Sequence, residues 1–93
     1  MNTSPTKAER SHMERVKELP CSVCGAPPPS AAHHIDQSCA WAVVALCYEC
    51  HQGRGGIHHE KTMWRIYKMD EVKALNVTLK RLFSEESRSG YRC

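Results

Sequence analysis

Two Cys-x-x-Cys pairs and five of the six histidines are concentrated in residues 21–59, which read CSVCGAPPPSAAHHIDQSCAWAVVALCYECHQGRGGIHH. The pairs are Cys21 with Cys24 and Cys47 with Cys50, and 22 residues lie between them. Each pair can occupy two corners of a tetrahedron from one tight turn, so the four thiolates predict a structural Zn²⁺ site. The gap exceeds the usual window of about 15–20 residues, and a β-hairpin between the pairs would account for the excess.

The histidines flank the second cysteine pair in two clusters. His33 and His34 are adjacent on a predicted strand, His51 directly follows the last cysteine, and His58 and His59 come later in the chain. A four-cysteine site would hold the backbone of His51 rigidly beside the strand that carries His33 and His34. The zinc site would then be the scaffold for a second site built from imidazoles, which serve as metal ligands and as acid–base groups.

The segments around this centre carry patterns of short strands and helices. Residues 31–35 and 41–47 are short, apolar and partly β-branched, which is typical of a hairpin. Residues 7–19, a segment from about Lys61, and a last segment with Asp70 as N-cap are predicted to be helical. The apolar residues expected to face the core are Ala8, Met13, Val16 and Leu19, then Met63, Trp64 and Tyr67, and finally Val72, Leu75, Leu79 and Leu82.

The composition indicates one small α+β domain supported by metal. The chain has 93 residues, of which only 15 are Leu, Ile, Val or Phe, and so thin a core needs a metal or a disulfide. Six cysteines in 93 residues are below the density of disulfide-built secreted domains, and residues 1–19 hold no apolar signal segment. The longest apolar run, residues 40–47, is too short to span a bilayer. We therefore expect a cytoplasmic protein without membrane contact.

The arrangement C-x-x-C, A-H-H-I, L-C-x-x-C-H and a later His resembles the HNH, or His-Me finger, endonucleases over residues 21–60. Within these it is most similar to phage-encoded members, including the recombination-enhancing phage nucleases. The resemblance implies a ββα-metal, treble-clef-like core in which a hairpin and a helix hold one divalent ion. It also implies DNA as substrate, phage or prophage origin, and a recombination or packaging protein as a partner.

Site residues carry over from the family by motif. His33 and His51 would ligate the catalytic ion, and His34 would be the general base that takes a proton from the attacking water. His58 fits the third ligand better than His59, although both stay open. The expected ion is Mg²⁺ or Mn²⁺, with Zn²⁺ or Ni²⁺ as alternatives, and it would neutralise charge on the phosphate and the leaving 3′ oxygen.

Two features depart from the family pattern. Ala42 stands where the motif has its central Asn, so Gln37, Ser38 or the backbone would have to fix the loop that carries the base. The interval from His51 to His58 is seven residues, whereas a compact helix would place two ligands about four apart.

Basic residues flank the Cys/His centre. Residues 21–50 contain no Lys or Arg, whereas residues 51–93 contain nine. The net charge of the whole chain is +3. Arg54, between two predicted ligands, is the best candidate for contact with the scissile phosphate, and Lys61, Arg65 and Lys68 could contact other phosphates without reading bases.

The expected organisation is a single domain over residues 1–93, with an N-terminal tail and helix (1–20), zinc knuckles and ββα-metal core (21–60), C-terminal helices (61–85) and a tail (86–93). Two other functional classes remain open. One is a non-catalytic zinc-dependent nucleic-acid-binding or adaptor module, and a weaker one is a redox protein that uses Cys-x-x-Cys. Cys39, Cys93 and the lone His12 receive no site role.

Overall fold

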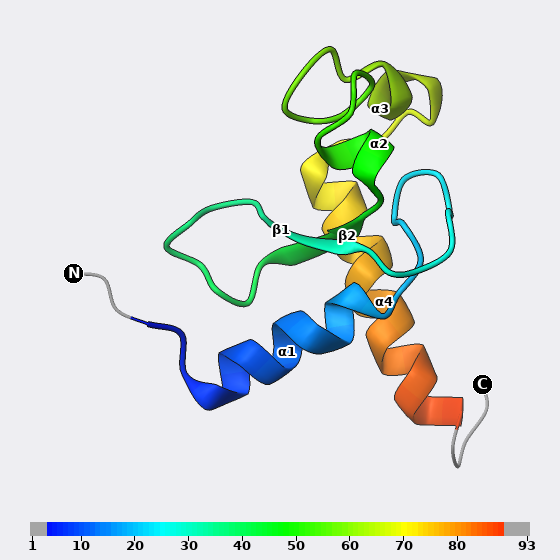
Figure 1. Ribbon diagram of the computed structural model, residues 1–93. Coiled ribbons are helices and arrows are strands. Elements are labelled where there is room, and N and C mark those ends of the chain that lie inside the picture. The colour runs from blue at the N-terminus through cyan, green and yellow to red at the C-terminus, as the bar shows by residue number, and fades with distance from the viewer. Residues whose placement is uncertain (1–3, 89–93) are drawn as a thin grey trace.

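The computed structural model describes the backbone of residues 4–88 and the side chains of residues 4–84. Its fold is α+β, as predicted, with one two-stranded antiparallel sheet among helices (Figure 1). The elements in chain order are α1 (Lys7–Lys17), β1 (Ala31–His34), β2 (Val43–Leu46), α2 (Tyr48–His51), α3 (Thr62–Ile66) and α4 (Glu71–Arg88). The predicted hairpin between the cysteine pairs is therefore present, with shorter strands than the apolar runs indicated.

The sheet register separates two apolar clusters. Ala32 pairs with Ala45 and His33 pairs with Val44, and directly paired residues share a face of an antiparallel sheet. One face packs against α1 and the C-terminal half of α4 through Val16, Leu19, Val43, Ala45 and Leu82. The other face packs against the cysteine knuckles, α3 and the start of α4 through Cys21, Val23, Val44, Leu46, Cys50, Trp64 and Ala74. Because both faces of β2 are covered, all four of its residues are buried.

The N-terminal helix begins with a well-formed cap. The Thr6 hydroxyl accepts a hydrogen bond from the backbone N–H of Glu9, and the Glu9 carboxylate accepts one from the backbone N–H of Thr6. This capping box satisfies two N–H groups that the first helical turn leaves unpaired. Thr6 is thus held in place as the N-cap of α1. Ala8, expected to face the core, is exposed.

The region between α3 and α4 differs from the predicted helical faces. Trp64 is buried as expected, but Tyr67 is 48% exposed and Val72 is 74% exposed. Tyr67 follows the end of α3, and the backbone turns at Lys68, whose φ of 54° lies in the left-handed region. The helical periodicity therefore stops before Tyr67 and starts again at α4, with a different face toward the core.

The last helix begins and ends close to its predicted bounds. The Asp70 carboxylate accepts a hydrogen bond from the backbone N–H of Lys73 at 2.8 Å, which confirms Asp70 as the N-cap of α4. The helix extends to Arg88, beyond the predicted limit of 85, and Cys93 lies outside the described residues. Among the residues described, no helix combines the length and the apolar character needed to cross a membrane.

Candidate metal centre

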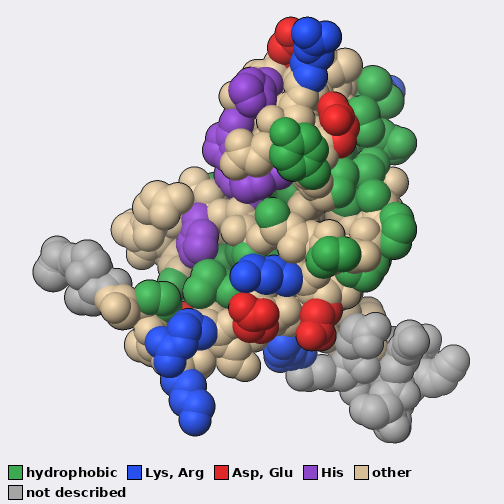
Figure 2. All heavy atoms as spheres, viewed as in Figure 1, with side chains coloured by type: hydrophobic (Ala, Val, Ile, Leu, Met, Phe, Trp, Pro, Cys, Tyr) green, Lys and Arg blue, Asp and Glu red, His purple; other side chains and the backbone are tan. Residues whose placement is uncertain are grey.

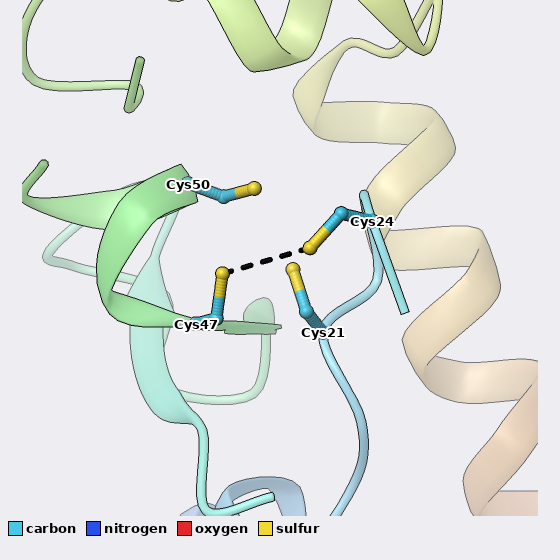
Figure 3. Close-up of side chains that lie close together, drawn as sticks. All are labelled: Cys21, Cys24, Cys47 and Cys50. Atoms are coloured by element: carbon cyan, nitrogen blue, oxygen red, sulfur yellow. Dashed lines mark hydrogen bonds between the residues drawn. The ribbon is translucent and has the colours of Figure 1, made fainter. Parts of the chain in front are cut away.

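The four paired cysteines converge at one point, as their spacing predicts. Cys21 and Cys24 come from the turn before the hairpin, and Cys47 and Cys50 come from the N-cap and the body of α2. Their sulfur atoms all lie within 4.8 Å of one another, and the side chains point toward a common centre (Figure 3). This arrangement can hold a metal ion.

The spacing of the sulfurs can be compared with the geometry of a tetrahedral zinc–thiolate site. Zn–S bonds of about 2.3 Å would separate two sulfurs by about 3.8 Å. The Sγ atoms of Cys24 and Cys47 lie 3.7 Å apart. Within the described residues all cysteines, including the exposed Cys39, are free thiols. The set of four therefore fits a tetrahedral ion with thiolate ligands.

The environment of the cysteines favours one thiolate before the others. Burial opposes ionisation of Cys21, but hydrogen bonds from the backbone of Cys24, Cys47 and Val23 outweigh it and lower its pKa to about 7. Burial and the charge of Cys21 raise the pKa of Cys24 and of Cys50. Four thiolates this close repel one another, so a bound cation would be needed to stabilise all of them together.

A second cluster contains three of the predicted histidines. His33 from β1, His51 from the end of α2 and His58 from the following loop place one ring nitrogen each within 4.8 Å of the other two. The Nε2 atoms of His51 and His58 are 3.2 Å apart. Two nitrogens bound to one ion at about 2.1 Å would lie about 3.0–3.4 Å apart, depending on the coordination geometry. Of the two candidates for the third position, the structure brings His58 and not His59 into this cluster.

The three rings are packed closely and differ in exposure. Their centroids are 4.8–5.3 Å apart and their planes are steeply inclined to one another. His33 is buried, His51 is half-buried and His58 is exposed, so the cluster opens toward solvent on one side. Figure 2 shows histidine side chains gathered along one flank of the molecule. Burial and the charges of the other two rings lower the pKa of His51, which favours the neutral form that a metal ligand requires.

Residues 52–57, here called the glycine loop, are tightly folded and connect His51 to His58. A Cβ atom at Gly56 would lie 2.5 Å from the backbone oxygen of His51, so only glycine fits at this position. The backbone N–H of Ile57 then donates to the carbonyl of Cys50 at 2.9 Å. The loop thus returns to the end of α2 and places His58 beside His51.

The loop is also held from its other side. The Glu49 carboxylate accepts a hydrogen bond from the backbone N–H of Gly55 at 3.0 Å. The indole N–H of Trp64 donates to the same Cys50 carbonyl at 2.8 Å and fastens α3 to the second cysteine pair. The second cysteine pair therefore anchors both the glycine loop and α3.

The predicted base and its loop are arranged as follows. His34 pairs with Val43, and because successive strand residues point to opposite faces, its side chain leaves the sheet on the face opposite to His33. At the position of the missing Asn, Ala42 accepts a hydrogen bond from the N–H of Ile35 at 3.2 Å and donates one to the Cys39 carbonyl at 3.1 Å. Backbone hydrogen bonds thus close this loop.

One residue in contact with the cluster was not predicted from the sequence. The Glu71 carboxylate, in the first turn of α4, lies 2.8 Å from Nε2 of His33. The two residues are 38 positions apart. The sequence placed a helix start at Asp70 but held no signal that this start lies against β1.

The predicted DNA-contact residues are exposed around the loop and α3. Arg54 lies in the loop between His51 and His58, and Lys61, Arg65 and Lys68 flank or belong to α3. The Arg65 guanidinium donates a hydrogen bond to the backbone oxygen of Glu60 at 2.8 Å.

Comparison of the chain with protein-family profiles, curated proteins and solved structures gives no match.

Proposed function

We propose that this protein is a metal-dependent endonuclease of the HNH, ββα-metal type that hydrolyses phosphodiester bonds in DNA. The observation that carries the proposal is the convergence of His33, His51 and His58 directly beside the four-cysteine cluster. In the proposed arrangement Zn²⁺ occupies the cysteines as a structural ion, and one Mg²⁺ or Mn²⁺ occupies the histidines. The resemblance of residues 21–60 to this family supports the same assignment.

In this proposal each step of phosphodiester hydrolysis is assigned to residues of the chain. His33, His51 and His58 would bind the divalent ion, which supplies charge neutralisation at the phosphate and the leaving oxygen. His34 would accept the proton of the attacking water. Within the described residues no strand pairs with the outer edge of β1, and in the proposal the phosphate would lie along this edge, within reach of residues from both faces. Arg54, exposed in the adjacent loop, would hold the scissile phosphate by charge-assisted hydrogen bonds.

The remaining basic residues would bind the DNA backbone without reading its sequence. Lys61, Arg65 and Lys68 are exposed, which leaves their charges available to phosphates. Phage or prophage origin, and a recombination or packaging protein that directs the nuclease to its substrate, belong to the same proposal.

Plasmid nicking tests the proposal directly. Supercoiled plasmid is incubated with the zinc-loaded protein and Mg²⁺ or Mn²⁺, beside the variants His34→Ala and His58→Ala. The matched control is His59→Ala, because His59 is a neighbouring exposed imidazole outside the cluster. We expect nicking by the wild type and the control, and its loss in the other two variants with one Zn²⁺ per chain retained. Unchanged nicking in His34→Ala would contradict its assignment as the base.

A second function is favoured by one observation. Ala42 lacks the side chain that the family uses to fix the loop of the base, and a chain without that group could bind nucleic acid or an adaptor partner without cutting. In this case the protein would retain DNA in a gel-shift assay. It would not nick the DNA, whichever metal ion is added. The redox alternative would require thiol–disulfide exchange that proceeds in the absence of bound Zn²⁺.

A further inference from the structure

The contact between His33 and Glu71 links the histidine cluster to the start of α4. Nε2 of His33 and Oε2 of Glu71 are 2.8 Å apart, and the His33 side chain is only 7% exposed. Glu71 is partly exposed, at 35%. A carboxylate at the start of a helix is already stabilised by the helix dipole. Its contact with the buried imidazole of His33 is an additional interaction.

The helix that carries Glu71 is fixed against the sheet. The Thr78 hydroxyl, two turns further along α4, lies 2.7 Å from the Ser22 hydroxyl and accepts a hydrogen bond from the backbone N–H of Ala45 at 3.3 Å. Ala74, between Glu71 and Thr78, is fully buried against the same core. Glu71 is thus presented to His33 from a rigid element, which is a requirement for a residue that orients another.

Glu71 contacts the cluster through one of its members. The ring nitrogens of His33, His51 and His58 lie within 4.8 Å of one another, and the Glu71 carboxylate does not belong to this mutually close set. Ligands of one ion at bond lengths of about 2.1 Å lie at most about 4.2 Å apart. Its place is therefore behind His33, not among the metal ligands.

The hydrogen bond fixes which nitrogen of His33 can bind a metal. An ionised carboxylate only accepts hydrogen bonds, so Nε2 of His33 must carry the proton that it donates to Glu71. A neutral imidazole has one N–H, which leaves the lone pair on Nδ1. Carboxylates in this position orient the ring of a ligand histidine and raise its basicity.

We propose that Glu71 is a positioning residue of the divalent-metal site, which holds His33 in the tautomer that offers Nδ1 to the ion. The inference rests on the proposed function, because it assigns a role toward the ion that the three histidines would bind. It explains why a buried histidine in a short strand is paired with a carboxylate from a distant helix. It also makes α4 part of the metal site, although no residue of α4 belongs to the ligand set.

The test is the affinity of the zinc-loaded protein for a second divalent ion. Mn²⁺ and Co²⁺ are titrated into the wild type, Glu71→Ala and Glu71→Gln, with Glu60→Gln as the matched control. Glu60 is exposed and lies two residues after His58, so its substitution removes one negative charge near the cluster without removing a contact of His33. Zinc content and the thermal unfolding midpoint are recorded for every variant, so that a folding defect is recognised separately.

We expect an affinity about 10–100-fold lower in Glu71→Ala, a smaller loss in Glu71→Gln and no change in Glu60→Gln. The glutamine amide oxygen can still accept the hydrogen bond from Nε2, which is the reason for the partial rescue. Wild-type affinity in Glu71→Ala would overturn the inference. Equal losses in both Glu71 variants would also overturn it, because a retained hydrogen-bond acceptor for Nε2 of His33 would then contribute nothing. A wild type that binds no second ion would instead contradict the proposed function.

Discussion

The substitution Gly56→Ala tests how the glycine loop builds the histidine cluster. The added Cβ would lie 2.5 Å from the His51 backbone oxygen and 2.9 Å from the Glu49 backbone oxygen. Both contacts involve backbone of the short helix α2, which cannot rotate away as a side chain would. The Gly56 backbone must therefore move away from α2 in the variant, and it carries His58 with it.

The size of the movement follows from ordinary contact distances. Carbon and carbonyl oxygen atoms approach to about 3.3 Å, so the loop must move by about 0.8 Å. If His58 follows the loop, its Nε2 atom moves from 3.2 Å to about 4 Å from Nε2 of His51. That separation exceeds the edge of about 3.0–3.4 Å between adjacent nitrogen ligands of one ion. We expect the affinity for a second divalent ion to fall about tenfold or more, and the free energy of unfolding to fall by about 1–3 kcal/mol.

Calorimetric titration of Mn²⁺ or Co²⁺ into zinc-loaded protein measures the affinity, and urea unfolding measures the stability. The matched control is Gly25→Ala, where a Cβ would meet no atom within 4 Å but the φ of 80° strains any other residue. We expect both variants to lose stability and only Gly56→Ala to lose affinity for the second ion. Equal affinity in Gly56→Ala and the wild type would refute the claim that this close approach positions His58.

Four further outcomes are expected. Chelation of the structural ion under reducing conditions should unfold the domain, seen by circular dichroism, because its thin apolar core depends on the four-cysteine site. Trp64→Phe removes the hydrogen bond to the Cys50 carbonyl and should lower the urea-unfolding free energy by about 0.5–1.5 kcal/mol. Lys68→Gly relieves a φ of 54° and should raise stability by about 0.5–1 kcal/mol while it weakens DNA retention in a gel-shift assay. Burial lowers the pKa of His12 below 6.5, so on acidification the unfolded chain binds a proton before the folded chain does, and the stability present above pH 6.5 should fall. In His12→Gln, which keeps a donor for the Trp41 carbonyl, the free energy of unfolding should fall less between pH 7.5 and pH 5.5, as measured by urea titration.

The cysteine and histidine positions could be predicted because local geometry dictates them. Two tight turns bring together the members of each cysteine pair, and a hairpin brings the two pairs together, so the spacing alone was sufficient. His51 follows from chain continuity with Cys50, and His33 follows from its place on the paired strand. The choice of His58 over His59 needed the loop conformation, which depends on the close approach of Gly56 to α2.

Other features depended on long-range packing that no local pattern records. Glu71 reaches His33 across 38 residues, and nothing in a helix-start signal indicates which strand the helix meets. Tyr67 and Val72 have apolar side chains at helical spacing, yet they are exposed because α3 ends at Ile66 and α4 begins with a new rotation. Hydrophobic periodicity predicts a face only while one helix continues.

The two clusters are joined by a single short element, and this determines how they depend on each other. The helix α2 runs from Tyr48 to His51. Its N-cap is Cys47, which belongs to the cysteine cluster, and its last residue is His51, which belongs to the histidine cluster. Four residues form too short a helix to be stable on their own, so α2 depends on its anchors. The Cys50 carbonyl further receives the hydrogen bonds that fix the glycine loop and α3. Loss of the cysteine-bound ion should therefore dismantle the histidine cluster, whereas loss of a histidine should leave the cysteine site intact. In the proposed function, this asymmetry would distinguish the structural ion at the cysteines from the divalent ion at the histidines.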